Sequence, residues 1–332
     1  MMPVVSRAAF ISSVAVAAMS LSLHAQELSL PLKPNSVRFA AIGDMGTGQK
    51  PQYELAGKMI EYRQKFPFEF VIMLGDNIYD DNGAGKGDYE SRFELPYKAL
   101  LDASVPFYAT LGNHDKPNER FYKPFNMNGQ QYYTYKKGNV RFFVLDTNDM
   151  NPRQLAWLEK ELRNSGSDWK ICYFHHPLYS SAAFHGSSTE LRLVLEPLFV
   201  KYGVNVVFAG HDHVYERVKP QKGITYFTEG ASGSLRQGNL RKTAMTAVGY
   251  DQDRSFMLVE IAGDELHFQT ISRIGRTVDS GVIQRVAAIG GAAILPTRDL
   301  LLLASLPPAT DRLPVSAERA PEGLNRRREP LL

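Results

Sequence analysis

Five short apolar runs are spread along the chain, and each of them leads into a polar loop. They cover residues 37–42, 70–74, 107–111, 170–174 and 204–209. Apolar runs of this length are typical of strands that are buried on both faces. We therefore expect these five segments to be the buried strands of a sheet.

Segments with a helical period lie between some of these strands. Residues 53–62 carry apolar side chains at helical spacing. Pro152 is expected to open a second helix, with Asn151 as its N-cap. A third helix is predicted over residues 191–199, where Pro197 would shorten or kink it. Helices that alternate with strands indicate a layered α/β domain.

Other runs have the character of antiparallel strands. A hairpin is predicted around Lys137-Gly138-Asn139, between residues 132–135 and 140–145. Further strands of this kind are expected at residues 224–228, 256–261 and 266–271, with a turn at Gly263-Asp264 between the last two.

The two ends of the chain differ from its centre. Arg7, an apolar stretch over residues 8–23 and the small Ala25 are typical of a secretory signal peptide covering residues 1–25. An uncleaved membrane anchor is the alternative interpretation. Residues 286–332 are rich in Ala, Leu, Pro and Arg without a clear period, which predicts a poorly ordered tail. Residues 26–285 remain for the folded domain.

Composition narrows the range of partners. The chain has 332 residues, 44% of them hydrophobic, and a net charge of +3. A chain of this length and hydrophobic content can bury a full core in one large domain or two small ones. The basic residues are scattered among acids, so no nucleic-acid partner and no stable membrane partner is expected. Cys172 is the one cysteine and is predicted to be a buried structural thiol. The oligomeric state stays open.

Each of the five apolar runs ends in side chains that bind metals. Ligand sites of α/β proteins form just beyond strand ends, where loops converge. Carboxylate, amide and imidazole donors suit iron, zinc and manganese, and one carboxylate can bridge two ions. The five motifs are Gly43-Asp44, Gly75-Asp76-Asn77-Ile78-Tyr79, Gly112-Asn113-His114-Asp115, His175-His176-Pro177 and Gly210-His211-Asp212-His213.

Single motifs have simpler interpretations. A lone Gly-Asp such as Gly43-Asp44 is usually a turn, and Asn113-His114-Asp115 by itself is equally well a polar loop. Tyr79 could be an aromatic side chain that packs beside its loop. The occurrence of all five motifs at strand ends favours a site for two metal ions.

In this order, the motifs resemble the signature of the calcineurin-like metallophosphoesterase superfamily. Tyr79, three residues after Asp76, is similar to the purple acid phosphatase type, which includes the tartrate-resistant acid phosphatases. His185, ten residues after His175, resembles an extra active-site histidine of its small members. The resemblance covers residues 37–285. It implies an α/β fold, a four-layer α/β/β/α sandwich of two mixed sheets flanked by helices.

The resemblance also implies the ligands of each ion. A ferric ion, Fe(3+), would be held by Asp44, Asp76, Tyr79 and His213. A divalent ion (Fe, Zn or Mn) would be held by Asp76, Asn113, His175 and His211, with Asp76 as the bridge. His176 is expected behind these ligands, because His175 better matches the His-x-Pro pattern.

The implied function is hydrolysis of phosphomonoesters by an exported acid phosphatase, which would be secreted or periplasmic. Two cations neutralise the charge of the phosphate, and a metal-bound hydroxide attacks phosphorus in line. The substrate would be a small-molecule phosphate ester or a phosphoprotein. One alternative is a phosphodiesterase of the same fold with two manganese or zinc ions, in which Tyr79 is not a ligand. Another is a degenerate module that binds phosphate without catalysis.

The leaving alkoxide needs a proton, and His114 is the leading candidate for its donor. His114 follows the expected ligand Asn113 and is not needed as a ligand itself. Asp115 or another carboxylate would orient it, and His185 is the second candidate. The substrate-binding residues remain unknown, although Tyr179, Phe184, Tyr215 and residues 82–87 are expected near the pocket.

Overall fold

The structure is a computed structural model that describes residues 28–79, 86–166, 168–241 and 243–285. The predicted signal peptide, residues 1–25, and the predicted tail, residues 286–332, lie outside the described residues, as does most of the 82–87 loop. No helix in the described ranges has the length and apolar character needed to cross a membrane.

The first of the two sheets has six strands among the described residues, in the order β13-β12-β11-β1-β2-β3. The strands β1, β2 and β3 are parallel, whereas β11, β12 and β13 are antiparallel to their neighbours, so the sheet is mixed. Their bounds are β1 Val37–Ile42, β2 Phe70–Met73, β3 Phe107–Ala109, β11 Ser255–Ala262, β12 Glu265–Ser272 and β13 Thr277–Gln284.

The second sheet has seven strands in the described part of the chain, in the order β10-β8-β9-β7-β6-β5-β4. The central strands β5, β6, β7 and β9 are parallel, and antiparallel pairs close both edges. Their bounds are β4 Tyr133–Lys137, β5 Val140–Val144, β6 Trp169–Tyr173, β7 Val206–Ala209, β8 Tyr215–Gln221, β9 Ile224–Glu229 and β10 Thr246–Tyr250.

Aromatic side chains join the inner faces of the two sheets. Phe39 of β1 packs edge-on against Phe142 of β5 and Phe208 of β7, with ring centroids 5.5 and 6.1 Å apart. Phe70 of β2 meets Phe142 in the same way at 5.6 Å. Edge-to-face pairs of this kind add to the stability that burial alone provides. The main core of the protein is therefore the space between the sheets.

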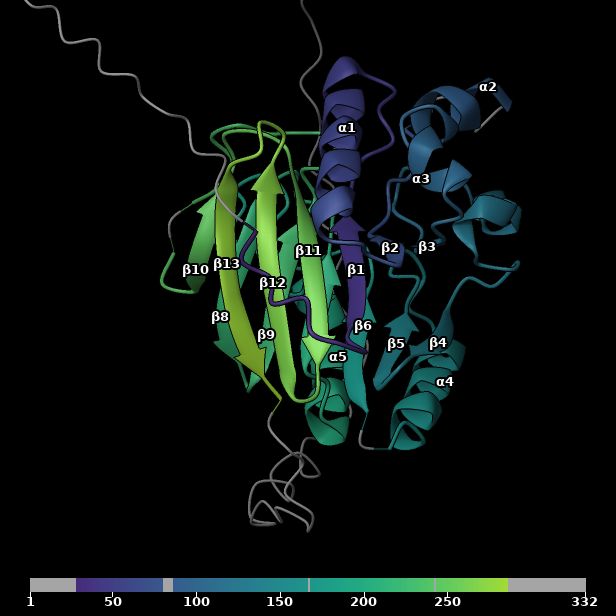
Figure 1. Cartoon of the computed structure of the whole chain (residues 1–332). Helices are drawn as coiled ribbons and strands as arrows, with labels where there is room; N and C mark the ends of the chain where they lie inside the picture. The colour runs from purple at the N-terminus through teal and green to yellow at the C-terminus, as the bar shows by residue number, and fades with distance from the viewer. Residues whose placement is uncertain (1–27, 80–85, 167, 242, 286–332) are drawn as a thin grey trace, which may run out of the picture. The chain divides into compact units, whose positions relative to one another are not determined.

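Helices cover the outer faces and complete four layers (Figure 1). On the first sheet, Tyr62 of α1 packs on Phe256 of β11. On the second sheet, Leu158 of α4 and Phe199 of α5 join Cys172 in a separate core. The helices are α1 Lys50–Lys65, α2 Lys86–Tyr89, α3 Lys98–Asp102, α4 Pro152–Arg163 and α5 Thr189–Tyr202, with short η1 Glu90–Glu94, η2 Pro117–Phe121 and η3 Lys123–Phe125. The predicted α/β/β/α sandwich is confirmed.

The helix predicted to begin at Pro152 is confirmed together with its cap, and it ends at Arg163. The side-chain oxygen of Asn151 accepts hydrogen bonds from the backbone N–H groups of Arg153 and Gln154, both at 3.1 Å. Of the two predicted effects of Pro197, the shortening of its helix is wrong, because α5 continues to Tyr202, and the kink stays a prediction. Pro197 lies on the exposed side of α5, where water can bond the carbonyl that proline leaves without a donor.

The predicted hairpin and the antiparallel pair β11–β12 are also confirmed. One prediction needs correction, because β9 runs parallel to β7 and is antiparallel only to β8. The strands β8, β10 and β13 were not predicted. Two of them, β10 and β13, are half-exposed edge strands, which need no continuous apolar run.

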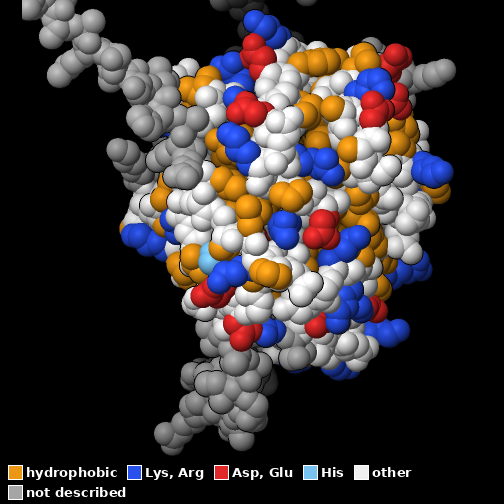
Figure 2. Space-filling model, in the orientation of Figure 1, with side chains coloured by type: hydrophobic (Ala, Val, Ile, Leu, Met, Phe, Trp, Pro, Cys, Tyr) orange, Lys and Arg blue, Asp and Glu red, His pale blue; other side chains and the backbone are white. Residues whose placement is uncertain are grey.

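The surface seen in Figure 2 carries Lys and Arg side chains interspersed with acidic and apolar ones. This agrees with the scattered charges of the sequence on this face of the molecule.

Strand register brings the ends of the parallel strands to one edge. In the first sheet Ile42 of β1 is level with Met73 of β2, which is level with Ala109 of β3. In the second sheet Tyr173 of β6 is level with Phe208 of β7. The loops that follow these five strands therefore start close together, and they are the loops that carry the metal-binding motifs.

Candidate metal centre

The backbone turns sharply at three of the predicted metal ligands. Asp44, Asp76 and His211 have positive φ angles of 54°, 50° and 70°. The left-handed region is uncommon for residues other than glycine and costs free energy. Such positions persist where the surrounding structure requires them, and here they turn the side chains toward the strand-end edge.

Two glycines allow the ligand loops to approach each other closely. A Cβ atom on Gly112 would lie 2.2 Å from Oδ1 of Asp76. A Cβ atom on Gly75 would lie 2.5 Å from Nδ1 of His175. Any side chain at these two positions would displace a ligand.

The first group of donor atoms comprises Asp44, Asp76 and His213, whose ligand atoms lie within 4.8 Å of one another. Nε2 of His213 is 3.3 Å from Oδ1 of Asp44. The Tyr79 hydroxyl lies between these two residues, 3.1 Å from Oδ1 of Asp44 and 3.0 Å from Nε2 of His213. The structure thus brings four of the predicted ligands together.

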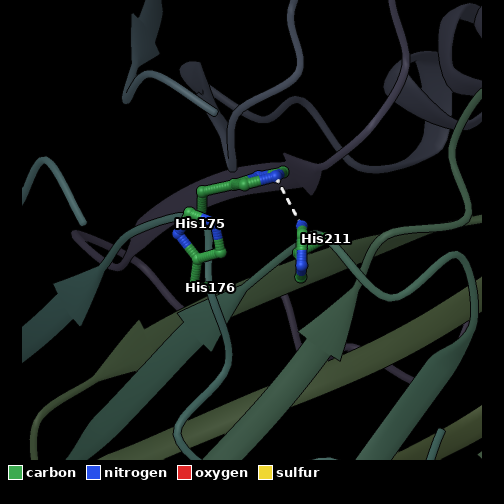
Figure 3. Close-up of side chains that lie close together, drawn as sticks. All are labelled: His175, His176 and His211. Atoms are coloured by element: carbon green, nitrogen blue, oxygen red, sulfur yellow. Dashed lines mark hydrogen bonds between the residues drawn. The ribbon is translucent and has the colours of Figure 1, made fainter. Parts of the chain in front are cut away.

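The second group comprises His175, His176 and His211, again with ligand atoms within 4.8 Å of one another. Figure 3 shows His175 facing His211, with 3.1 Å between Nε2 of His175 and Nδ1 of His211. Oδ1 of Asn113 lies 3.0 Å from Nε2 of His175. Oδ1 of Asp76 is 3.4 Å from the same nitrogen, so Asp76 lies between the two groups.

His176 lies closer to the donor atoms than the sequence predicted. It belongs to the second group by distance, and its ring is 4.5 Å from that of His211. Its Nδ1 is 2.9 Å from the hydroxyl of Thr147. A bond of this kind orients a histidine beside a metal site.

The carboxylates of the first group repel each other inside the protein. Burial and the negative charge of Asp76 raise the pKa of Asp44 well above its usual value. Burial also raises the pKa of Asp76. The pKa of the Tyr79 phenol is raised by burial and by the charges of Asp44 and Asp76. A cation between these groups would relieve the repulsion and favour their deprotonated forms.

Burial lowers the pKa of each histidine in the two donor groups, which favours the neutral form that binds metals. Burial, followed by the nearby imidazoles of His175 and His176, lowers the pKa of His211 to about 2. Burial and the charge of Arg236 lower the pKa of His213 to about 4. Nδ1 of His175 faces the carbonyl oxygen of Leu74 at 2.9 Å, which assigns the proton to Nδ1 and leaves Nε2 unprotonated, as a metal ligand must be.

This donor set fits two metal ions. Carboxylate, phenol, amide and imidazole groups converge in two adjacent groups that share Asp76. Oxygen and nitrogen donors in this mixture suit iron, zinc and manganese better than magnesium or calcium, which take oxygen ligands.

Asp115 fixes the shape of the ligand loops. Its carboxylate accepts hydrogen bonds from the backbone N–H groups of Asn77, Ile78 and Gly112 at 2.7, 3.0 and 2.8 Å. These bonds join the loops that carry Asp76 and Asn113. The predicted effect of Asp115 on the His114 ring stays a prediction.

The two predicted proton donors border the donor groups and are exposed. The backbone N–H of His114 donates to Oδ1 of Asp76 at 2.9 Å, and its ring lies 4.8 Å from that of Tyr79. The His185 ring lies 4.0 Å from that of His211. Burial and the charge of Arg236 lower the pKa of His185.

The structure places the three tested pocket residues in different surroundings. Phe184 is 64% exposed and packs beside His185. The prediction for Tyr215 is wrong, because its side chain is fully buried and its hydroxyl donates to Asp279 at 2.7 Å. Tyr179 packs against Tyr226 in the outer core of the second sheet.

A sixth loop, which sequence reasoning missed, also borders the metal groups. It follows β9 and spans residues 230–236. The backbone N–H of Ser234 donates to the carbonyl of Asp44 at 2.9 Å, and that of Arg236 donates to the carbonyl of His213 at 3.0 Å. The available signal was a glycine-rich loop after an apolar strand, but it carries no metal ligand and so was not identified.

The fold and these two groups define the class as a metal-binding α/β/β/α sandwich protein with a centre built from strand-end loops. The family model of the calcineurin-like phosphoesterases matches residues 37–215. The chain belongs to this family.

Several relatives are phosphatases by name. Tartrate-resistant acid phosphatase type 5 of Rattus norvegicus is 26% identical over 311 residues, covering 77% of this chain and 94% of the rat protein. Purple acid phosphatase 4 of Arabidopsis thaliana is 27% identical over 285 residues, covering 74% of this chain and 83% of its own. A purple acid phosphatase from yellow lupin seeds has a TM-score of 0.64 at 22% identity, covering 83% of this chain and 57% of its own, which supports the fold.

Proposed function

We propose that this protein is an exported acid phosphatase of the purple acid phosphatase type, which hydrolyses phosphomonoesters at a centre of one ferric and one divalent ion. The observation that carries the proposal is the Tyr79 hydroxyl, placed within 3.1 Å of both Asp44 and His213. A tyrosine at this point gives a ferric ion a hard phenolate ligand. The names of the relatives support the same activity.

The proposed ligands follow the two donor groups. The ferric ion would be held by Asp44, Asp76, Tyr79 and His213, and the divalent ion, Fe, Zn or Mn, by Asp76, Asn113, His175 and His211. Together the two ions would neutralise the charge of the phosphate and lower the pKa of a water molecule. The low pKa values of His211 and His213, about 2 and about 4, keep these imidazoles available as ligands at acidic pH.

Three further side chains transfer a proton or hold the ligand loops in position. His114 donates a proton to the leaving oxygen, and His185 assists from the face of His211. Asp115 holds the loops of Asp76 and Asn113 in place through backbone N–H groups. The substrate is a small phosphate ester or a phosphoprotein.

A visible spectrum tests the ferric phenolate. The iron-loaded protein should be violet to pink, because a phenolate bound to ferric iron absorbs visible light by charge transfer. Tyr79→Phe should lose this band, and Tyr53→Phe, which changes an outer tyrosine of α1, should keep it. A colourless iron-loaded wild type would favour the dimanganese or dizinc phosphodiesterase. Turnover of nitrophenyl phosphate and of bis-nitrophenyl phosphate then separates monoester from diester hydrolysis.

Export is proposed from the N-terminal sequence. Mass spectrometry of the secreted or periplasmic protein should find a chain that starts near Gln26. An intact Met1 on exported protein would contradict cleavage.

A further inference from the structure

Arg236 is a half-buried cation at the edge of the metal centre. Its backbone N–H donates to the carbonyl oxygen of His213 at 3.0 Å, so its position is set by a ligand loop. Among the residues that the structure describes, no carboxylate forms an ion pair with it; the contacts of its guanidinium are Phe184 and His185. A half-buried guanidinium that forms no ion pair within the described ranges has N–H donors left for a ligand.

The side chain of Arg236 is held in one direction. Its guanidinium carbon lies 3.5 Å from the centroid of the Phe184 ring. Its Nη1 is 3.5 Å from Nε2 of His185, and the His185 ring lies 4.0 Å from that of His211. Stacking on an aromatic ring restrains arginine while leaving its donors free. The side chain of His185 thus lies between the guanidinium and His211, a proposed metal ligand.

The guanidinium of Arg236 lies near the metal centre. The side chain of His185 stands between it and His211, and the Arg236 backbone is bonded to that of His213. An anion bound at the metal groups is therefore within its electrostatic reach. Since His185 separates Arg236 from His211, the guanidinium is placed to meet a part of the substrate beyond the reacting phosphate.

We propose that Arg236 binds a second anionic group of the substrate, a carboxylate or a second phosphate. The planar guanidinium binds either group through paired N–H donors. The site then selects phosphate esters that carry another anion close to the reacting phosphorus over esters without one. This inference rests on the proposed phosphatase function and adds the substrate class.

Three small substrates of similar size test the proposal. Ethyl phosphate has no second anion, phosphoglycolate adds a carboxylate, and ethylene glycol bisphosphate adds a phosphate. Arg236→Gln should lower kcat/KM for the last two by about tenfold to a hundredfold, the usual range for a lost charged hydrogen bond. For ethyl phosphate the loss should be less than about threefold. A loss confined to phosphoglycolate or to the bisphosphate identifies which anion is preferred.

Two variants control the measurement. Arg236→Lys keeps the charge but not the paired donors and should retain part of the discrimination. Arg63→Gln removes another arginine that stacks on a ring, that of Phe68, which precedes β2 at the end opposite Asp76. Arg63→Gln should leave kcat/KM for all three substrates unchanged. Equal losses for all three substrates in Arg236→Gln would overturn the proposal and assign Arg236 to the reacting phosphate.

Binding of inhibitors separates this inference from the phosphatase function. Phosphonoacetate and ethylphosphonate differ by the same carboxylate and are not hydrolysed. Calorimetry on the metal-loaded protein should show tighter binding of phosphonoacetate, and Arg236→Gln should remove the difference. If the protein binds with this preference but turns over no ester, the phosphatase function is wrong and the inference stands. If esters are hydrolysed and neither assay shows a preference, the inference is wrong and the function stands.

Discussion

Asp76 occupies the central position of the candidate site. It shares one group with Asp44 and His213, and its Oδ1 is 3.4 Å from Nε2 of His175 in the other. The same oxygen accepts the backbone N–H of His114 at 2.9 Å. One carboxylate thus contacts both donor groups and the loop of the proposed proton donor, although these residues are far apart in the sequence.

Replacement of Asp76 should remove both metals. Wild-type protein should contain close to two transition metals per chain, and Asp76→Ala should lose most of both, because each group loses a shared anionic ligand. Elemental analysis by mass spectrometry measures the content. Asp102→Ala removes an exposed carboxylate of α3 and should keep both metals. Full metal content in Asp76→Ala would contradict the bridging position.

The loss of hydrolysis rate on replacement of His114 should depend on the leaving group of the substrate. A nitrophenolate leaves without a proton, whereas an alkoxide needs one, and general acid catalysis contributes about 10²–10⁴-fold. His114→Ala should therefore slow alkyl phosphates by this factor and nitrophenyl phosphate much less, with metals retained. His185→Ala should show a weaker form of the same trend.

The control for His114 is another histidine of the chain. His267→Ala changes a residue that pairs with Glu265 on β12 and should affect neither substrate. Equal slowing of both substrates by His114→Ala would exclude it as the acid, because its effect would then lie on the nucleophile or the phosphoryl group.

At the scale of elements, the site depends on how closely the strand-end loops pack. The loops after β2 and β3 meet where Gly112 faces Asp76, and Asp115 ties both loops together through backbone N–H groups. The strands set the position of each loop through their register, and the glycines allow the remaining approach.

A methyl group at Gly112 should disrupt the centre without unfolding the sandwich. In Gly112→Ala the new Cβ would meet Oδ1 of Asp76 at 2.2 Å, so metal content and turnover should fall severely. Gly57→Ala is the matched control, since its Cβ would meet nothing within 4 Å in α1. That change should raise the free energy of unfolding by about 1 kcal/mol. Normal metal binding in Gly112→Ala would show that the loop can move aside.

At the scale of the whole molecule, the protein places a buried acid, Glu229, near Asp44 of the metal centre. Glu229, at the end of β9, is fully buried, and Oε1 accepts the Ser255 hydroxyl at 2.8 Å. Burial, with a smaller effect of Asp44, raises the pKa of Glu229 to about 8. A carboxyl group of this kind is protonated in the folded protein and ionised in the unfolded chain at neutral pH.

The pH dependence of stability follows from this difference. A raised folded pKa means that the stabilising contribution is present below the unfolded value of 4.5 and is lost as pH rises toward about 8. In the metal-free protein, Glu229 should lower the free energy of unfolding by up to about 1.4 kcal/mol for each unit by which the pH rises within that window. Glu229→Gln mimics the protonated acid, so the variant should not lose this part of its free energy of unfolding as the pH rises.

Thermal unfolding at two pH values tests this expectation. The metal-free wild type and Glu229→Gln should unfold at similar temperatures below pH 4.5, and the variant should be the more stable one at pH 8. A constant difference across this range would mean that Glu229 does not change protonation on unfolding.

The sequence alone determined the parts of this protein whose physics is local. The five buried strands follow from apolar runs, and the Asn151 cap follows from a side chain that bonds the N–H groups two and three residues later. The ligand motifs were also predictable, because glycines and metal-binding residues are adjacent in the chain. Their order implied the family, which the match over residues 37–215 confirms.

Only the tertiary structure decided which distant segments meet. The order of the strands places Tyr215 against Asp279, 64 residues away, and so removes it from the pocket. The same order brings Arg236 to the carbonyl of His213 and its guanidinium to His185, contacts that no local pattern announces. Edge strands such as β10 and β13 need only partners for their hydrogen bonds, not apolar runs of their own. Pairing across the sheets depends on their three-dimensional order, and hydrophobic periodicity carries no information about that order.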